Sequence, residues 1–348
     1  MTGKTDIKSL SIEELRKHLS DLGEPAFRAG QVFSWLHQKR AQSFDEMTNL
    51  SKALREKLNE QFYIPHIAIK QKLVSELDGT VKYLYELEDG ETVEAVFMRY
   101  HHGNSLCIST QVGCRMGCTF CASTLGGCVR NLTPAEMLSE IQMAEHDTQE
   151  KVSSLVLMGI GEPLDNYDNV VRFLQLLSDA NGMNMSLRHV SLSTCGLVPR
   201  IYDLAELRLG LTLSVSLHAP NDEIRSRTMP VNRRYPIDEL LTACRHYAEK
   251  TSRRISFEYA LIDGVNDGEL NARELAGRLK GMLCHVNLIP VNPVTERGYK
   301  ASTRNAIERF TAVLERAGIP VTVRRRLGAD INAACGQLRR ESQRASES

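Results

Sequence analysis

The chain has 348 residues, 42% of them hydrophobic and 25% charged, which fits a globular enzyme with one large domain and an accessory one. Lysine plus arginine and aspartate plus glutamate both number 43, so the zero net charge gives no global indication of a nucleic-acid partner. No apolar stretch is long enough to span a bilayer, the first residues lack a signal peptide, and nine cysteines fit reactive or metal-bound thiols. We therefore expect a cytoplasmic protein without a membrane partner.

Residues 1–62 are expected to form a helical accessory domain. Ser11 and Glu14 have the spacing of a capping box that opens one helix, and Ser51 is placed to cap another. Between them, apolar residues at helical spacing predict a further helix after Pro25. Scattered charges on such helices more often form a solvated face than a phosphate contact, and we favour that interpretation for Arg16, Lys17, Arg28, Lys39 and Arg40.

Residues 63–103 are expected to form a β segment that leads into the core. Asp78-Gly79 lies between two strand-like runs and predicts a hairpin turn, and Asp89-Gly90 predicts a second turn. Glu94 lies in the following strand, ETVEAVFMRY, flanked by apolar residues. The alternation of that strand alone predicts that the Glu94 side chain faces solvent.

Three closely spaced cysteines, Cys114, Cys118 and Cys121, follow in a Cys-x-x-x-Cys-x-x-Cys pattern. A structural zinc site and an ordinary iron–sulfur cluster each take four protein ligands, so three favour a cubane cluster with one iron left open for chemistry. The triplet alone leaves zinc open as an alternative. The zinc ligands would then be completed by Cys107, Cys128, His101 or His102.

From about residue 104 to 325 the sequence alternates between strand and helix patterns, which is typical of parallel β/α architecture. Six strand-like runs give six βα repeats: SLCIST, SSLVLM, HVSLSTCG, LTLSVSLHA, ISFEYALI and HVNLIPVN. Six repeats fit an incomplete (βα) barrel. In such barrels functional groups gather at the carboxyl ends of the strands.

Four of these strands end in polar residues: Gly161-Glu162-Pro163, Ser193-Thr194, Ser216-Leu217-His218 and Asn292-Pro293. A glycine there lets a ligand approach the backbone, and the carboxylate, hydroxyl, imidazole and amide groups can bind polar parts of a ligand. Each cluster alone could be a turn or a cap. Their occurrence on four strand ends predicts a cofactor site.

Residues 326–348 are expected to form a C-terminal tail that carries Cys335 in a small-residue context, Ala-Ala-Cys-Gly. Nearby cations favour the thiolate form, which is the nucleophile, and three arginines lie at 324–326, where the tail begins. A lone cysteine is more commonly a buried structural residue. The residues around Cys335 leave both interpretations open.

The cysteine triplet, with Phe120 before the last cysteine, resembles that of radical S-adenosylmethionine (SAM) enzymes. Over essentially the whole chain the sequence resembles the RlmN family of radical SAM RNA methyltransferases. The matching segments are CISTQVGCRMGCTFCASTLGG, MGIGEPLDN, the Ser193-Thr194 strand end, SLHAPNDEIRSRTMPVNRRYPI, LIPVNP and GADINAACGQL. This resemblance implies an α/β fold, a partial (βα)6 TIM-like radical SAM barrel with an N-terminal helical accessory domain and a C-terminal extension.

The resemblance further implies methylation of C2 of an adenine in 23S rRNA and of an adenine in tRNA. A related Cfr-type methyltransferase acts at C8 instead, and Pro163 and Val112 favour the C2 branch. A zinc-stabilised RNA-binding protein without catalysis is the alternative from another class. The resemblance also suggests an electron donor such as flavodoxin, and a monomer is our default expectation.

By the same resemblance, Cys114, Cys118 and Cys121 hold a [4Fe–4S] cluster whose open iron binds SAM. SAM contacts are implied for Gly161, Glu162, Ser193, Ser216, Leu217, His218 and Asn292. Two SAM molecules serve each turnover: one methylates Cys335, and the other yields a 5′-deoxyadenosyl radical that takes a hydrogen from that methyl group. Cys107 then forms a transient disulfide with Cys335, and Glu94 removes the ring proton. Arg324 to Arg326, Arg339 and Arg340 are candidate phosphate contacts.

Overall fold

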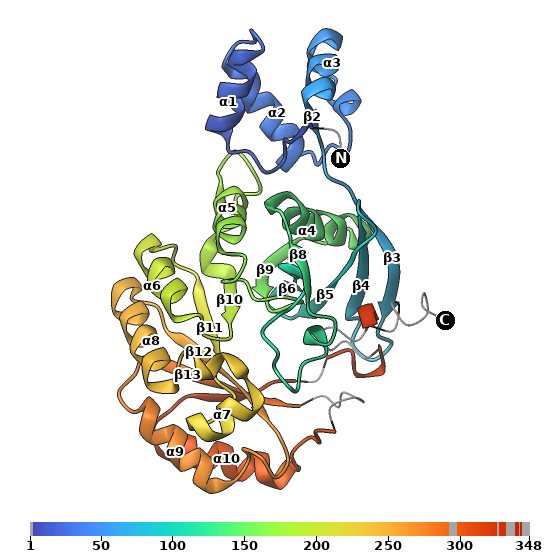
Figure 1. Ribbon diagram of the computed structural model, residues 1–348. Helices are drawn as coiled ribbons and strands as arrows, with labels where there is room; N and C mark the ends of the chain where they lie inside the picture. The colour runs from blue at the N-terminus through green and yellow to red at the C-terminus, as the bar shows by residue number, and fades with distance from the viewer. Residues whose placement is uncertain (1–2, 292–297, 326, 332–337, 341, 343–348) are drawn as a thin grey trace.

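The computed structural model describes residues 3–291, 298–325, 327–331, 338–340 and 342. Its N-terminal part contains three helices, α1 (Ile12–Asp21), α2 (Phe27–His37) and α3 (Lys52–Gln61), which lie together at one end of the molecule (Figure 1). The capping box predicted for α1 is confirmed, because the Ser11 side chain accepts the Glu14 N–H while the Glu14 carboxylate accepts the Ser11 N–H. Ser51 caps α3 as expected.

A ten-stranded sheet forms the centre of the fold, in the order β14-β13-β12-β11-β10-β9-β6-β5-β4-β3. Pairing is parallel from β14 to β6 and antiparallel from β6 to β3. The strands are β3 (Ile67–Val74), β4 (Val81–Leu87), β5 (Thr92–Tyr100), β6 (Gly103–Cys107), β9 (Val152–Leu157), β10 (Val190–Thr194), β11 (Thr212–Ser216), β12 (Ile255–Leu261), β13 (Cys284–Pro290) and β14 (Val321–Val323).

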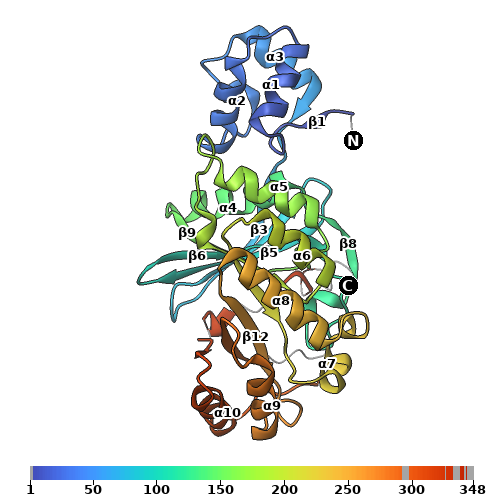
Figure 2. The ribbon, with the colours of Figure 1, turned by 90° about the vertical axis from the view of Figure 1, so that its left-hand side faces the viewer.

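Helices follow the parallel strands and cover one face of the sheet, as the two ribbon views show (Figures 1 and 2). They are α4 (Pro134–Thr148), α5 (Tyr167–Ser178), α6 (Val198–Leu207), α8 (Ile237–Thr251), α9 (Glu269–Leu279) and α10 (Arg304–Arg316). The short helix α7 (Asp222–Thr228) lies at the ends of β10 and β11 instead. Shorter elements are β1 (Thr5–Asp6), β2 (Phe62–Tyr63), β7 (Gln111–Gly113), β8 (Cys128–Asn131), η1 (Phe44–Glu46), η2 (Ala122–Thr124), η3 (Leu187–His189), η4 (Pro230–Arg233) and η5 (Ala329–Ile331).

The expected fold class is confirmed: β6 and β9 to β13 are the six parallel strands of the predicted partial barrel. The short strand β14 adds a further parallel strand beside β13. The three antiparallel strands β3, β4 and β5 continue the same sheet beyond β6. The barrel and the β segment that precedes it in the sequence therefore share one continuous backbone hydrogen-bond network.

The two faces of the sheet differ in polarity. Side chains that point toward the helices form a large apolar core, to which every parallel strand from β6 to β13 contributes. Several positions on the other face are polar. The Ser191 and Ser214 hydroxyls bond at 2.8 Å, and the Glu258 carboxylate accepts from Ser256 at 2.9 Å and Asn287 at 2.7 Å. A polar inner face with satisfied hydrogen bonds fits a barrel that receives a polar ligand.

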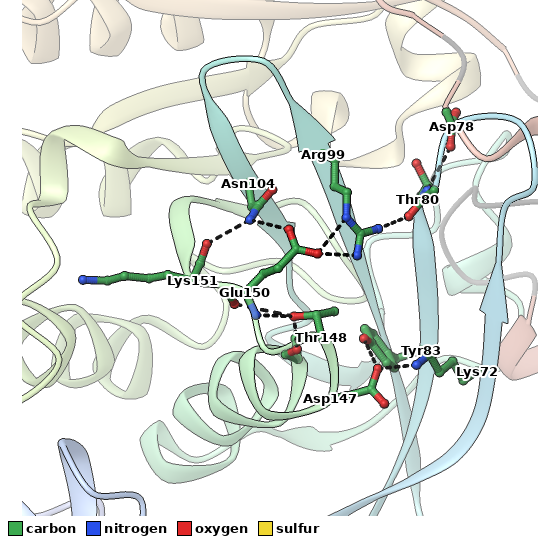
Figure 3. A network of polar contacts seen from close by, with 12 residues as sticks. Lys72, Asp78, Thr80, Tyr83, Arg99, Asn104, Asp147, Thr148, Glu150 and Lys151 are labelled. Carbon is green, nitrogen blue, oxygen red and sulfur yellow. Dashed lines mark hydrogen bonds and ion pairs between the residues drawn. The ribbon is translucent and has the colours of Figure 1, made fainter.

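Polar contacts join the antiparallel strands to the end of α4 (Figure 3). Asp147 accepts from the Tyr83 hydroxyl at 2.6 Å and pairs with Lys72 at 2.6 Å. Glu150 pairs with Arg99 at 2.6 Å and accepts from Asn104 at 3.1 Å. These contacts fix β3, β4 and β5 against α4 and the loop that follows it.

Candidate cofactor and active site

The loop that carries Cys114, Cys118 and Cys121 is shaped by the short antiparallel pair β7–β8. The Cys114 N–H donates to the Gly127 carbonyl at 2.8 Å. Gly113 has a φ of +80°, and a Cβ there would lie 2.0 Å from the same carbonyl oxygen. Only glycine fits this approach, so Gly113 sets where the cysteine loop leaves β7.

The three thiols are near enough to influence one another. Burial raises the pKa of Cys114 to about 12, and the Cys121 thiol adds to that rise. Burial likewise raises the pKa of Cys118 above its usual range, with further contributions from Cys121 and Cys114. Enclosed thiolates repel one another unless a cation lies among them. A positively charged metal centre would relieve that repulsion, so the donor set fits an iron–sulfur cluster.

Among the described residues, no three His, Cys, Asp or Glu side chains, those of the cysteine triplet included, are arranged as the ligands of one metal ion. The choice between zinc and a cluster therefore rests on the residues around the triplet.

Glu162 connects the ends of two neighbouring strands, β9 and β10. Its carboxylate accepts the Cys195 N–H at 2.7 Å and the Leu164 N–H at 3.0 Å. Burial raises the pKa of Glu162, and these hydrogen bonds oppose that rise. Just before it, Gly161 has a φ of +110°, and a Cβ there would lie 2.7 Å from the Gln111 nitrogen. The strand end thus places a buried carboxylate directly after Gly161, whose positive φ and close approach to Gln111 leave no room for a side chain.

His218 is a buried residue at the end of β11 with a defined tautomer. Its Nδ1 accepts the Ala260 N–H at 2.8 Å, so Nε2 carries the ring proton. Burial lowers its pKa to about 3, which keeps the imidazole neutral in the neutral pH range. The ring also meets Phe120 of the cysteine loop edge-on, with centroids 5.0 Å apart. This contact links the loop to the strand end.

The other predicted SAM-binding residues lie in different surroundings. Ser193 on β10 and Ser216 on β11 are half-buried, while Leu217 is fully buried. Ser193 is paired with Ser214 in the register of β10 and β11. Asn292 lies outside the described residues.

Arg225 is a fully buried residue of α7 that the sequence did not single out. Its guanidinium donates to the carbonyls of Cys195 at 2.6 Å, Ser216 at 3.1 Å and Leu217 at 3.1 Å. It therefore ties the ends of β10 and β11 together. Its positive charge also favours the thiolate form of Cys118. The only sequence signal for it was its place within the segment from Ser216 to Ile237.

Glu94 is buried, with 1% of its surface exposed, so the prediction that it faces solvent is wrong. Its carboxylate pairs with the buried Lys82 ammonium at 3.2 Å and accepts the Arg339 N–H at 2.7 Å. Strand alternation gave the wrong environment because β5 is buried on both faces from Thr92 to Met98, and the C-terminal segment reaches Glu94 through Arg339. Lys82 was not recognised in the sequence.

Cys107 lies at the end of β6, on the same face of the sheet as Glu94. It is opposite Val96 in the β5–β6 register, and residues 94 and 96 of a strand point to the same side. Its buried side chain packs with Val96 and Met98, and Leu327 packs against the group. Cys107 and Glu94 thus share the inner face of the barrel.

The C-terminal segment is held against the antiparallel strands on both sides of 332–337, the range that contains Cys335 and lies outside the described residues. Before it, Asp330 accepts from the Ser75 hydroxyl at 2.7 Å and the Glu76 N–H at 2.9 Å. After it, Arg339 contacts Glu94 and pairs with Glu91 at 3.1 Å. The described residues on the two sides of this range therefore contact the β3–β4 turn and Glu94 on β5.

The basic residues proposed as phosphate contacts have different environments. Arg339 is 6% exposed and ion-paired with Glu91, which contradicts that assignment. Arg324 and Arg325 are exposed and Arg340 is half-buried, so all three stay candidates, while Arg326 lies outside the described residues. In the N-terminal part, Arg40 pairs with the buried Glu145 of α4. This ion pair connects the helical domain to the core.

Comparison with known proteins gives consistent matches along the chain. Residues 5–64 match the family model described as the ribosomal RNA large subunit methyltransferase N-terminal domain, and residues 108–276 match the radical SAM superfamily. A probable dual-specificity RNA methyltransferase RlmN from Alkaliphilus oremlandii is 58% identical over 97% of this chain and 98% of its own length. Another protein of that name, from Lachnoclostridium phytofermentans, is 54% identical over 98% of this chain and 96% of its own length.

Among solved structures, a radical SAM methyltransferase from Sphaerobacter thermophilus is 43% identical, with a TM-score of 0.90. The match covers 96% of this chain and 98% of that protein. Within the described part of the chain, no helix is both long and apolar enough to cross a membrane.

Proposed function

Because the chain belongs to the RlmN family of radical SAM RNA methyltransferases, we propose that it methylates C2 of an adenine in 23S rRNA and of an adenine in tRNA. The relatives' description as dual-specificity enzymes supports two RNA substrates. The C2 position is supported by Pro163 and Val112, which resemble the C2 branch of the family.

One observation carries this proposal. A buried carboxylate, Glu94, and a buried thiol, Cys107, lie on the inner face of a partial barrel, and the segments flanking Cys335 contact the antiparallel strands of the same sheet. A structural zinc protein would have no use for this arrangement. A reaction that alkylates one cysteine and resolves it with another needs all three groups.

The cofactor-binding residues are proposed from the geometry described above. Cys114, Cys118 and Cys121 would hold a [4Fe–4S] cluster, while the strand-end residues from Gly161 to His218, with Asn292, would bind SAM. When bound, these cofactors supply a methyl group from one SAM and a 5′-deoxyadenosyl radical from a second. The neutral His218 and the buried Glu162 can each make a directional hydrogen bond to SAM.

The chain's own residues carry the remaining steps. The Cys335 thiolate accepts the methyl group, whose carbon later joins C2 of the adenine. Glu94 takes the proton from C2. Cys107 attacks the Cys335 sulfur and breaks the bond between that sulfur and the methyl carbon. The carbon leaves with the electron pair of that bond and takes a proton, which completes the methyl group on C2. The resulting Cys107–Cys335 disulfide must be reduced by a thiol before the next turnover.

We further propose that the functional division of the chain follows residues 1–62, 63–103, 104–325 and 326–348, with the last range presenting Cys335. A flavodoxin-type donor would supply the electron, and the enzyme would act as a monomer. The target base must leave its stack to reach the inner face of the barrel, as for other enzymes that act on bases.

The direct test is mass spectrometry of RNA from cells that lack the protein and from cells in which it is restored. We expect 2-methyladenosine in 23S rRNA and tRNA to disappear and to return. Appearance of 8-methyladenosine instead would assign the chain to the C8-specific activity. If neither RNA changes, the proposed function is wrong.

A further inference from the structure

Lys82 is a cation enclosed on the inner face of the sheet. It lies on β4 and is fully buried, and its ammonium is 3.2 Å from the Glu94 carboxylate. The neighbouring Tyr83 and Tyr85 belong to the apolar core, while Lys82 lies opposite Val96 on β5. Residues 82, 94 and 96 therefore share one side of the sheet, which is also the side of Cys107.

The fold by itself gives no reason for this ion pair. Enclosing two charges costs more than their attraction returns unless the geometry is good, and an apolar pair of similar size is often equally stable. Strand β4 is otherwise almost entirely buried and apolar or aromatic, so an apolar side chain would fit the local pattern at position 82. A lysine in this place suggests a role for its charge.

The Glu94 carboxylate is fixed by two donors, one on each oxygen. Lys82 approaches Oε2, and the Arg339 N–H donates to Oε1 at 2.7 Å. Arg339 itself is held by Glu91, which precedes β5. The orientation of Glu94 is thus coupled to Arg339, which follows Cys335 by four residues in the C-terminal segment.

We infer that Lys82 is a positioning residue of the methylation reaction: its ammonium holds Glu94 Oε2 so that the carboxylate keeps one orientation beside the docked tail. The inference rests on the proposed function of Glu94 as the base that takes the ring proton. Lys82 then acts only through Glu94. It is needed for release of the RNA but not for methylation of Cys335.

The test uses the full-length, anaerobically reconstituted protein and a short RNA hairpin containing the target adenine. Lys82→Met removes the charge at similar length, and Lys82→Arg keeps it. For Lys82→Met we expect methylation of Cys335, read by peptide mass spectrometry, to be unchanged. Product formation should fall on the order of 10- to 100-fold, the loss expected of a misplaced base. A covalent protein–RNA adduct should accumulate on a denaturing gel, and Lys82→Arg should recover most of the product.

A double variant separates positioning from general packing. Because Lys82 acts through Glu94, Lys82→Met combined with Glu94→Gln should be no slower in adduct release than Glu94→Gln alone. The double variant also removes both buried charges, so it should fold even if Lys82→Met is unstable. The matched control is Lys72→Met on β3, which removes a half-exposed lysine paired with Asp147 and should leave release unchanged.

Two results would overturn the inference. In the first, the double variant releases RNA more slowly than Glu94→Gln by the factor that Lys82→Met alone causes. In the second, Lys82→Met lowers Cys335 methylation as much as it lowers product formation. If Glu94→Gln released RNA as fast as the wild type, Glu94 would not be the base of the proposed function. Lys82 would then have no role through it.

Discussion

Single side chains in this protein take their roles from partners that are distant in the sequence. Arg225, Glu162 and His218 each bond to backbone of a neighbouring strand end, with partners 30, 33 and 42 residues away. Buried polar groups that are fully satisfied hold one arrangement rather than several. At this scale the site consists of charged or polar groups that are placed by backbone hydrogen bonds.

Replacing Arg225 by lysine should destabilise the protein although the charge is kept. Lysine lacks the planar fork that reaches the three strand-end carbonyls, so buried acceptors lose their donors. We expect a loss of about 2–4 kcal/mol in the free energy of unfolding, measured by urea denaturation. The control is Arg227→Lys on the same helix, where the exposed side chain pairs with Glu223. Equal stability of the two variants would contradict the proposed tie.

Replacing Cys107 by alanine should trap an intermediate. In the proposed reaction Cys107 is the thiol that attacks the Cys335 sulfur, so without it the RNA should stay attached to the protein. We expect a band of protein–RNA adduct on a denaturing gel, with cluster content as in the wild type. The control is Cys284→Ala on β13, a buried cysteine on the core side of the sheet. Free RNA in the Cys107→Ala lane would remove the resolving role.

Secondary structure elements position the site through a few constrained junctions. The loop after β7 turns at a glycine that no other residue can replace, and the N-terminal helices attach to α4 through buried polar contacts. In both places the backbone of one element fits closely against another. The consequences of disturbing them differ, because one junction holds the cysteines and the other joins two parts of the chain.

Gly113→Ala should disturb the cysteine loop selectively. The added Cβ would meet the Gly127 carbonyl at 2.0 Å, and φ is positive there. We expect a loss of more than about 1 kcal/mol in stability and incomplete iron binding after reconstitution. Gly126→Ala is the control, since nothing lies within 4 Å of its Cβ position. The measurement is iron and sulfide content per chain, and full content in Gly113→Ala would contradict the expectation.

The junction between the N-terminal part and α4 should make stability depend on pH. Lys8 is buried and donates to the Ser139 hydroxyl at 2.6 Å; burial lowers its pKa to about 7, with Arg40 lowering it further and Asp6 opposing. The unfolded chain keeps this proton to about pH 10.5, so between pH 7 and 10.5 it binds more protons than the folded chain, and stability rises with pH.

We expect the unfolding free energy of the wild type minus that of Lys8→Met to increase by up to about 1.4 kcal/mol per pH unit across that range. Denaturation series at several pH values measure it. The nearby His37, whose pKa burial lowers to about 3, is already neutral above pH 7 and contributes no slope there. Parallel curves for the two proteins would show that Lys8 keeps its proton in the folded state.

At the scale of the whole molecule, one sheet joins two halves with different tasks. The parallel strands carry the cysteine loop and the proposed SAM-binding residues, while the antiparallel strands carry Glu94 and receive the C-terminal segment. Cys107 lies on β6, where the two halves meet. The proposed reaction would therefore require both halves of the sheet to stay in register.

Weakening the attachment of the tail should slow turnover without unfolding the protein. The Asp330 carboxylate accepts from Ser75 and Glu76 at the β3–β4 hairpin, so Asp330→Ala releases one end of the segment around Cys335. We expect product formation to fall severalfold at an unchanged melting temperature. Glu76→Ala is the matched control, because it keeps the N–H that Asp330 uses. Wild-type turnover in Asp330→Ala would show that this attachment is dispensable.

Local patterns in the sequence determined the positions of most of the secondary structure elements named above and the kind of site they carry. The capping residues Ser11 and Ser51 predicted helix starts, Asp78-Gly79 predicted a hairpin, and six strand-like runs predicted the parallel part of the sheet, because these signals depend on residues close in the chain. The spacing of the three cysteines and the polar strand ends pointed to a cofactor site for the same reason.

Only the tertiary structure decided the environment of the reacting groups. Alternation along β5 predicted an exposed Glu94, whereas Lys82 from β4 and Arg339 from the C-terminal segment enclose it. The tautomer of His218 and the role of Arg225 likewise depend on strands that meet them only in the folded chain. Burial and pairing of a charge are set by what packs against it, and those neighbours come from parts of the sequence that no local pattern connects.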